Sequence, residues 1–301
     1  MSKVLIPFEI SNTRKHPEEV LGIFVHQNNI GMEGSQSPKG TVLLSGGSSG
    51  IGAAASRMLA EEGFRVYALS RRGTAPEHPL IVPVKADIND ESAVKDAVAS
   101  IIRQEGKIDV LVCNAGNGIA GSIEETPVQD AKGQFETCYF GALRLIREVL
   151  PYMRERKSGK IITVASVGAI IPLPFQAHYS AVKSATLSMT EALSLEVKPF
   201  GIQCSCILPG DAKTGFTAAR KTFGKENGPY SEKLKSSVSK MEKDEQQGMS
   251  PEKIASQIVK QAKSKHLKPV VTPGLQYKAI NMLYAILPRR LALKIIGMLY
   301  A

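Results

Sequence analysis

The stretch Thr41-Val-Leu-Leu-Ser45-Gly46-Gly-Ser-Ser-Gly50-Ile-Gly52 decides the fold of this chain. Its apolar start predicts a buried strand, its glycine run predicts a tight turn, and the continuation from Ala53 to Glu62 predicts a helix. Glycine tolerates positive φ and lets the backbone come close to a pyrophosphate, while a helix N-terminus offers free amides and a partial positive charge. Strand, turn and helix in this order therefore predict a dinucleotide-binding unit.

From residue 41 onwards, short apolar runs alternate with segments of helical periodicity. This alternation is typical of βαβ units, and it predicts a single α/β, doubly wound Rossmann domain over residues 40–273 with a seven-stranded parallel sheet and helices on both faces. The expected strands are near 41–45, 64–69, 80–84, 108–113, 160–165, 202–208 and 268–272. The expected helices are near 50–62, 90–104, 130–156, 178–198 and 251–265.

The charge of the 301-residue chain is unevenly spread. The formal net charge is +10, yet residues 1–210 carry 21 Lys and Arg against 21 Asp and Glu, whereas residues 211–301 carry 17 against 7. A basic block bears on partners and solubility more than on chemistry. Because it contains no aromatic-interleaved stripe and no known reader motif, the sequence does not predict a nucleic-acid partner.

The four cysteines and five histidines predict neither a disulfide scaffold nor a metal site. Cys204 and Cys206 are two residues apart in an apolar run, which places both on one face of a strand and predicts buried thiols. No histidine lies in a HExxH or CxxC…HxxxH pattern, so we expect no metal ligands.

Residues 1–39 show no assignable pattern. The apolar run from Val4 to Phe8 is interrupted by Pro7 and is too short for a secretory signal, and no stretch approaches the roughly 18 apolar residues of a membrane span. We therefore expect a cytoplasmic protein. Met32 lies just before the fold, and we hypothesise that it is the true start and that the leader before it is dispensable.

Residues 211–250 differ in composition from the rest of the predicted domain. They are rich in Lys, Glu, Ser and Gly and lie between the sixth strand and the next helix. Structureless loops of this length are uncommon unless they are functional or disordered, which favours a mobile substrate lid. A long solvated connection with no role is the other interpretation.

The end of the second strand indicates which form of the dinucleotide is bound. The acidic residue that would bind a free ribose 2′-hydroxyl is absent there, and Leu69 is followed by Ser70, Arg71 and Arg72. An arginine can pair with a 2′-phosphate through two parallel hydrogen bonds. Arg71 therefore predicts NADP rather than NAD, the alternative being two solvated loop arginines.

Two other motifs coincide with these segments. Gly46-Gly-Ser48-Ser-Gly50 also matches GxSxG, the nucleophile elbow of serine hydrolases, but no downstream histidine has a recognisable context. Ser180-Ala-Val-Lys183 with Lys213-Thr-Gly215 matches the SxxK and KTG pair of β-lactamases, without the Ser-Asp-Asn that should lie between them. A serine hydrolase acting through Ser48 is therefore only a remote alternative.

Ser166, Tyr179 and Lys183 form the predicted catalytic set. Tyr179 and Lys183 are four residues apart, which places phenol and ammonium on one helix face. A free phenol has a pKa near ~10, too high for ready proton exchange at neutral pH, so a neighbouring cation is needed to favour its ionised form. Ser166 follows an expected strand, where its hydroxyl could donate to a substrate carbonyl.

With these residues the chain resembles the short-chain dehydrogenase/reductase family from about residue 41 to 272. SGGSSGIG, Cys113-Asn114-Ala115-Gly116, Ser166, Tyr179xxxLys183 and Pro209-Gly210 occur in the family's order. The resemblance implies an enzyme that acts on CH–OH groups with NAD(P), in which Tyr179 exchanges the proton, Lys183 also holds the nicotinamide ribose and Ser166 polarises the carbonyl. It implies cofactor contacts from Ser45, Gly46, Ser48, Ser49, Gly50, Ile51, Gly52, Arg71, Asp87, Asn114, Ala115, Gly116, Tyr179, Lys183, Pro209, Gly210 and Thr214.

One position departs from the family's pattern. The family usually carries an asparagine in its long fourth helix that supports a proton-relay water, and this chain has Cys138 there. A thiol hydrogen-bonds far more weakly than an amide. We therefore expect a rerouted relay or slow turnover, and a cofactor-binding homologue with little or no turnover is the alternative function.

The predicted substrate is a small lipophilic molecule. No charged residue lies between Ile161 and Val182, and Val167 to Phe175 is almost wholly apolar. Together with Asp109 to Gly116, this segment is similar to hydroxysteroid and retinol dehydrogenases, implying a steroid-, retinoid- or long-chain-like alcohol or ketone. An apolar wall that merely packs is the alternative. The family resemblance also implies a homodimer or homotetramer, paired through the fourth and fifth helices.

Residues 274–301 form an amphipathic C-terminal tail. Ile280, Leu283, Leu287, Leu291 and Ile295 alternate with lysine and arginine residues in this segment. Such a tail could rest on an anionic membrane, which predicts a peripheral membrane contact. Closure of the substrate pocket or a contact between subunits would equally explain its apolar face.

Overall fold

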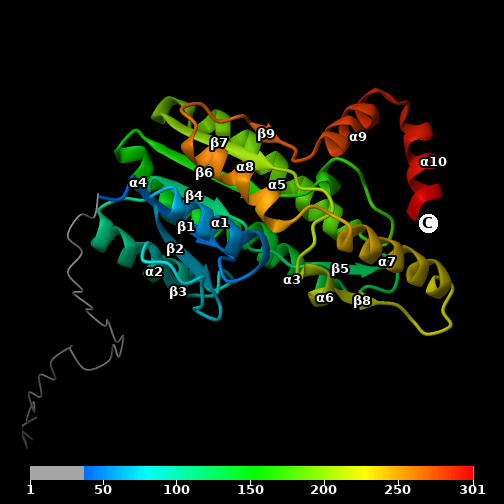
Figure 1. Ribbon diagram of the computed structural model, residues 1–301. Coiled ribbons are helices and arrows are strands. Elements are labelled where there is room, and N and C mark those ends of the chain that lie inside the picture. The colour runs from blue at the N-terminus through cyan, green and yellow to red at the C-terminus, as the bar shows by residue number, and fades with distance from the viewer. Residues whose placement is uncertain (1–36, 301) are drawn as a thin grey trace, which may run out of the picture. The chain divides into compact units, whose positions relative to one another are not determined.

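The computed structural model describes residues 37–300, and its centre is a parallel sheet (Figure 1). Within the described residues the main sheet has seven strands in the order β3-β2-β1-β4-β6-β7-β9, all paired in parallel. This confirms the predicted doubly wound fold. The strands are β1 (Thr41–Ser45), β2 (Arg65–Ser70), β3 (Ile81–Lys85), β4 (Val110–Cys113), β6 (Gly159–Val164), β7 (Ile202–Ile207) and β9 (Val270–Val271).

Helices cover both faces of this sheet. α1 (Gly50–Glu61) and α8 (Pro251–Lys263) lie on one face, where Leu59 and Ile258 pack on the strand residues Val42 and Val112. α2 (Glu91–Glu105), α4 (Gly141–Glu155) and α5 (Ala177–Glu196) lie on the other face, around Leu43 and Leu111. Since the central strands are buried on both sides, they are nearly continuous apolar runs.

The expected helix over residues 130–156 is confirmed as a continuous helical stretch from Val128 to Glu155, but it is not regular throughout. α3 (Val128–Phe135) and α4 are joined by a π-helical turn at Glu136–Phe140 that contains Cys138. The apolar periodicity runs through all three pieces, so it did not reveal the change in hydrogen-bond spacing. Single π turns are frequent at functional sites, and this one places Cys138 at the sheet edge described below.

Residues 211–250 contain regular structure. They form α6 (Phe216–Ala219), β8 (Lys221–Phe223) and α7 (Ser231–Gln246), and β8 pairs in parallel with β5 (Ile119–Gly121) as a second sheet. A buried ion pair joins Arg220 to Glu245, and Thr217 Oγ1 donates to Glu245 Oε2 at 2.5 Å. The sequence pattern predicted none of these elements.

The C-terminal tail is a pair of helices, α9 (Leu275–Ile286) and α10 (Arg289–Tyr300). They extend from the right-hand end of the fold in Figure 1, where α10 turns back towards α7. Among the described residues no helix is both long and apolar enough to cross a membrane. Apart from residues 37–39, the predicted N-terminal leader, with Met32, lies outside the described residues.

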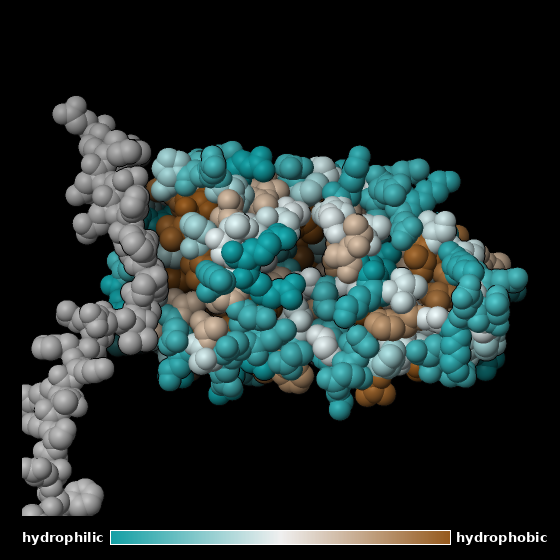
Figure 2. Space-filling view, turned by 90° about the horizontal axis from the view of Figure 1, so that it is seen from below, coloured by the Kyte–Doolittle hydropathy of each residue, from teal (hydrophilic) through white to brown (hydrophobic). Residues whose placement is uncertain are grey.

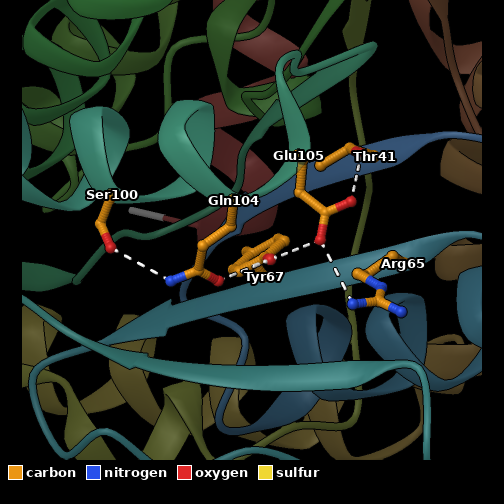
Figure 3. A network of polar contacts seen from close by, with 6 residues as sticks. All are labelled: Thr41, Arg65, Tyr67, Ser100, Gln104 and Glu105. Carbon is orange, nitrogen blue, oxygen red and sulfur yellow. Dashed lines mark hydrogen bonds and ion pairs between the residues drawn. The ribbon is translucent and has the colours of Figure 1, made fainter. Parts of the chain in front are cut away.

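A polar network fixes the C-terminal end of α2 to the amino ends of β1 and β2 (Figure 3). The Tyr67 hydroxyl donates to Glu105 Oε1 at 2.7 Å and lies 3.1 Å from Gln104 Oε1. Arg65 and Thr41 also donate to Glu105. Burial, followed by the neighbouring Glu105 carboxylate, raises the pKa of Tyr67, so its hydroxyl remains a donor. This network lies at the opposite end of the strands from the candidate site.

The predicted burial of Cys204 and Cys206 is confirmed, because their side chains are inside the core. Burial raises the pKa of Cys204 to about 12 and that of Cys206 to about 11. The face of the molecule in Figure 2 is mainly hydrophilic, and its hydrophobic residues appear in separate small areas. This surface pattern is ordinary for a folded domain.

Candidate active site

The glycine turn between β1 and α1 has the backbone that its sequence demands. Gly46 and Gly50 have φ values of +73° and +52°, which favour glycine. A Cβ atom at Gly47 would lie 2.7 Å from the Ala68 Cβ, so the turn also packs tightly on β2. The turn therefore brings bare backbone to the carboxyl edge of the sheet, between β2 and β4.

The start of α1 is suited to a phosphate. Its N-cap residue Ser49 makes no side-chain capping bond, and no acidic residue lies in the first turn. The first amides, including those of Gly50 and Ile51, are therefore not taken by a cap, and the helix dipole adds positive charge there. The residues present fit the pyrophosphate of a dinucleotide.

Asn114 and Ser45 join the glycine turn to the end of β4. Asn114 Nδ2 donates to the Ser45 carbonyl at 3.1 Å, while Ser45 Oγ accepts from the amides of Asn114 and Ala115 at 3.1 and 3.2 Å. A Cβ atom at Gly52 would lie 2.7 Å from Asn114 Nδ2, so this glycine lets the amide approach. These contacts fix the loop that continues to Gly116 beside the turn.

The arginine that contacts the glycine turn is Arg72. Its Nη2 donates to Ser48 Oγ at 3.0 Å, on the exposed side of the turn. Arg71 is also exposed, next to it. The sequence predicted cofactor contacts from Arg71 and Ser48, but it gave no sign that Ser48 pairs with Arg72. Asp87 follows β3, and its Oδ1 accepts from the Asn89 amide at 3.0 Å, which shapes the loop before α2.

Ser166 and Tyr179 converge on Gly168. Ser166 follows β6, and its Oγ accepts from the Gly168 amide at 3.1 Å at the start of a short 3-10 turn, Val167–Ala169. A Cβ atom on Gly168 would lie 3.4 Å from Tyr179 Cε1 and 3.5 Å from Ser166 Oγ. Ser166, which follows β6, and Tyr179 of α5 therefore lie around the same small space next to Gly168. A side chain at position 168 would occupy part of that space.

Lys183 lies beside Tyr179 on the same face of α5, as the spacing predicted. Its Nζ is 5.7 Å from the centroid of the Tyr179 ring and donates to the Val164 carbonyl at 3.1 Å. Only 7% of Lys183 is exposed. A buried ammonium needs partners, and one carbonyl leaves two of its three donors for other groups at this edge.

Cys138 lies near Lys183, next to the loop after β4. Its Sγ is 3.4 Å from Asn117 Oδ1, and a Cβ atom on Gly116 would be 3.4 Å from that sulfur and 3.7 Å from Lys183 Nζ. The thiol and the ammonium therefore border the same point. Asn117 was not singled out by the sequence analysis, although it directly follows the Cys113–Gly116 motif.

The loop after β7 carries Pro209, Gly210 and Thr214. The Val167 amide donates to the Pro209 carbonyl at 2.8 Å, which ties this loop to the residue after Ser166. A Cβ atom on Gly50 would lie 3.5 Å from Thr214 Cβ, so Thr214 lies against the glycine turn. Thr214 Oγ1 accepts from the Phe216 amide at 3.2 Å, at the start of α6.

Tyr277 of α9 packs directly on this loop, although no motif in the sequence indicated it. A Cβ atom on Gly210 would overlap the Tyr277 ring. The Tyr277 hydroxyl accepts from the Asp211 amide at 3.0 Å and donates to Asp211 Oδ2 at 2.8 Å. Burial is the main cause that raises the pKa of the Asp211 carboxyl.

Phe216 of α6 connects residues 211–250 to the candidate catalytic residues. The centroid of the Phe216 ring is 6.0 Å from the centroid of the Tyr179 ring. The guanidinium carbon of Arg220 lies 5.9 Å from the centroid of the Phe216 ring. A Cβ atom at Gly118 would lie 2.6 Å from Phe216 Cζ. An apolar ring therefore adjoins the Tyr179 phenol.

Comparison with known proteins agrees with this arrangement. The sequence profile described as short chain dehydrogenase matches residues 40–224. The chain belongs to the short-chain dehydrogenase family. It is an oxidoreductase that acts on CH–OH groups with NAD(P), as the resemblance implied. The hydrolase interpretation of Ser48 loses its basis, because the same GxSxG residues form this family's glycine turn.

Individual relatives of this short-chain dehydrogenase include a 3-ketodihydrosphingosine reductase from Bacteroides thetaiotaomicron, 38% identical over 221 residues, which are 73% of this chain and 82% of the relative. Estradiol 17-beta-dehydrogenase 1 from Rattus norvegicus is 34% identical over 191 residues, 58% of this chain and 55% of that protein. A short-chain dehydrogenase structure from Streptomyces avermitilis matches with a TM-score of 0.75 and 28% identity, covering 83% of this chain and 93% of the other.

Proposed function

We propose that this enzyme is an NADP-dependent oxidoreductase that moves a hydride between nicotinamide and a lipophilic secondary alcohol or ketone. The observation that carries the proposal is the convergence of Ser166 Oγ and the Tyr179 ring on Gly168, with Lys183 Nζ beside that ring. These groups lie at the sheet edge that also holds the uncapped start of α1. Ligands of doubly wound folds bind at this edge.

In the proposed reaction the protein positions the cofactor and handles the proton. The nicotinamide, when bound, gives or takes the hydride. Tyr179 gives a proton to the carbonyl oxygen during reduction or takes it from the alcohol during oxidation, and Ser166 Oγ donates a hydrogen bond to the same oxygen. Lys183 keeps positive charge beside the phenol and has donors free for a ribose hydroxyl.

The dinucleotide is proposed to lie along the glycine turn. Gly46, Ser49, Gly50, Ile51 and Gly52 form the backbone cradle for the pyrophosphate, and Asp87 lies beyond β3 on the adenine side. Asn114, Ala115, Gly116, Pro209, Gly210 and Thr214 border the nicotinamide half, with Ser45 holding the loop. All of these residues belong to the ends of β1, β3, β4 and β7 or to the segments that follow those ends.

The preference for NADP rests on two arginines. Arg71 is exposed directly after β2, and Arg72 reaches Ser48 of the glycine turn. A 2′-phosphate between them would accept charge-assisted hydrogen bonds that a free 2′-hydroxyl could not match. NAD is therefore the weaker cofactor in this proposal.

The proposed substrate is steroid-, retinoid- or long-chain-like. Ile170, Ile171 and Leu173 follow Ser166 in a segment without charge, and Phe216 adds an aromatic ring next to Tyr179. The names of the Bacteroides and rat relatives refer to a sphingoid ketone and to a steroid alcohol. Both are lipophilic molecules in which a secondary alcohol and a ketone interconvert. Residues 211–250, which carry Phe216, are proposed as the substrate lid.

We also propose a cytoplasmic location, at most peripheral to a membrane, and a homodimer or homotetramer. On the apolar face of α4, Ile146 is buried in the core, while Leu143 and Leu150 are half-buried. Leu195 of α5 is 74% exposed and extends the surface available to a second subunit. No nucleic-acid partner is proposed.

NADPH titration followed by a panel of lipophilic ketones tests the proposed activity. We expect oxidation of NADPH with at least one ketone and a loss of about 10²-fold or more in kcat for Tyr179→Phe, with cofactor binding retained. Thr190→Ser, a buried change further along α5, is the matched control. NADPH binding without turnover across the whole panel would instead support the second candidate, a cofactor-binding protein impaired by Cys138.

A further inference from the structure

α9 and α10 expose an unusual amount of apolar surface. Nine of the fourteen exposed large hydrophobic side chains within residues 37–300 belong to these two helices. In α9 they are Leu275, Ile280, Met282, Leu283 and Ile286, between 47% and 83% exposed. Single exposed hydrophobic residues are normal on proteins, but a concentration on one short segment indicates a binding surface.

One row of apolar side chains on α9 faces away from the rest of the fold. Tyr277, the buried residue of α9, is anchored on Gly210 and Asp211. Leu275, Met282 and Ile286 are spaced by seven and four residues, which places them in one row on the opposite side of the helix. The contact with the fold therefore leaves this row free.

α10 also has one side that packs on the fold and an opposite side that is exposed. Ala292 and Ile296 are buried, and Tyr300 one turn further on lies under Lys240 of α7, whose Nζ is 5.3 Å from the ring centroid. Arg290, Lys294 and Met298 have the same spacing on the other side and are exposed. Because that side combines cations with a long apolar side chain, it has the composition of helices that lie in a membrane interface.

The charge of this surface selects its partner. Residues 274–301 contain Lys278, Arg289, Arg290 and Lys294 and no Asp or Glu. Two copies of one surface meeting across a twofold axis would bring these cations together, which opposes a dimer through this face. An anionic lipid surface attracts them and accepts the apolar side chains below its headgroups.

We propose that α9 and α10 form an interfacial docking surface for an anionic lipid bilayer. Each helix has 12 residues, about 18 Å of helix, which is too short to cross a bilayer and suits a position along its surface. Tyr277 belongs to a buried cluster with Met249 and Ile254. Ile51 of the glycine turn and Val167, the residue after Ser166, pack against this cluster. Docking therefore holds the candidate active site close to the lipid in which a lipophilic substrate dissolves.

Vesicle co-sedimentation of the full chain tests docking without any substrate, so its outcome is independent of the proposed activity. We expect binding to phosphatidylcholine vesicles that contain phosphatidylglycerol, weak binding to phosphatidylcholine alone, and loss of binding in about 1 M salt. Arg290→Gln with Lys294→Gln should lower partitioning about tenfold or more. Met282→Gln with Ile286→Gln removes two exposed apolar side chains. This variant should lose the part of the vesicle binding that the wild type retains at moderate salt concentration.

Two matched variants serve as controls. Lys95→Gln with Arg103→Gln removes two exposed cations from α2, and Val128→Gln removes an exposed apolar side chain from α3. Both should bind vesicles like the wild type, and NADPH binding by each variant shows that it is folded. Equal vesicle binding by all variants would overturn the proposal. The proposal would also be overturned if Met282→Gln with Ile286→Gln changed the protein from a dimer to a monomer but left vesicle binding unaltered. That result would mean that a second copy of the chain covers this side of α9.

Discussion

The sulfur of Cys138 lies 3.4 Å from Oδ1 of Asn117, within the π turn that joins α3 to α4. The thiol therefore contacts an amide oxygen at the place where the family usually has an asparagine. Lys183 is also near, because a Cβ atom on Gly116 would lie 3.4 Å from the Cys138 sulfur and 3.7 Å from Lys183 Nζ. A thiol is a weak donor, so it holds a neighbouring water or carbonyl poorly. Asn117 is the nearby polar group through which a proton path could be rerouted.

Cys138→Asn should raise kcat, by up to about tenfold, with little change in KM, because it strengthens hydrogen bonding beside Lys183 without altering the substrate wall. Steady-state kinetics with NADPH and an active ketone measures the effect. Serine is nearly isosteric with cysteine and is a better hydrogen-bond donor, so the kcat of Cys138→Ser should lie between the kcat of the wild type and that of Cys138→Asn. Unchanged kcat in both folded variants would show that this position does not limit turnover.

Arg72→Ala should weaken NADPH much more than NADH. Removal of a charge-assisted partner for the 2′-phosphate is worth about 10- to 100-fold in affinity. Fluorescence titration with each reduced cofactor measures the ratio, and Arg71→Ala shows how the two arginines share the contact. Arg103→Ala, an exposed arginine on α2, is the control. An equal loss for both cofactors would indicate that Arg72 only holds Ser48 in place.

The positions of the candidate catalytic residues were predictable because they follow from local rules. Tyr179 and Lys183 share a helix face at a spacing of four, and Ser166 directly follows a strand whose apolar run is clear. The glycine turn was predictable for the same reason, since strand, turn and helix are consecutive in the chain. Parallel pairing then brings the strand ends to one edge without further information.

The contacts that the sequence did not reveal depend on chain paths rather than on local patterns. Arg71 and Arg72 are adjacent in one loop, and only the path of that loop decides which guanidinium reaches Ser48. Tyr277 meets Asp211 across 66 residues, and neither residue belongs to a motif. The short strand β8 has three residues, too few to show periodicity, and exists because β5 pairs with it.

Tyr67→Phe should destabilise the protein by about 1.5–3 kcal/mol, because it removes a buried hydroxyl that donates to the Glu105 carboxylate. Arg65 and Thr41 remain as partners of Glu105, which limits the loss. Denaturant unfolding followed by circular dichroism measures the change. Tyr152→Phe, at a half-buried tyrosine of α4 outside this network, should have a smaller effect. Equal losses in the two variants would mean that the Tyr67–Glu105 bond has no special weight.

Asp211 should make the free energy of unfolding depend on pH, through its raised pKa. Burial raises the pKa of this carboxyl in the folded protein above the ordinary value of 3.8, with Asp244 acting in the same direction and the Tyr277 hydroxyl and Lys240 opposing it. The folded state therefore holds this proton more tightly than the unfolded chain. As the pH rises above 3.8, the unfolded chain releases the proton first, so the contribution of Asp211 to stability falls until the folded carboxyl has also ionised.

Asp211→Asn removes this titration while keeping an oxygen that can accept from Tyr277. The difference in unfolding free energy between Asp211→Asn and the wild type should therefore shift in favour of the variant as the pH rises above 3.8, and it should become constant once the folded carboxyl has also ionised. Denaturant unfolding across this range measures it, and Asp96→Asn on the exposed side of α2 shows whether removing any carboxylate has the same effect. A difference that stays flat, or that shifts in favour of the wild type as the pH rises, would contradict a raised pKa of Asp211 beside Tyr277 of α9.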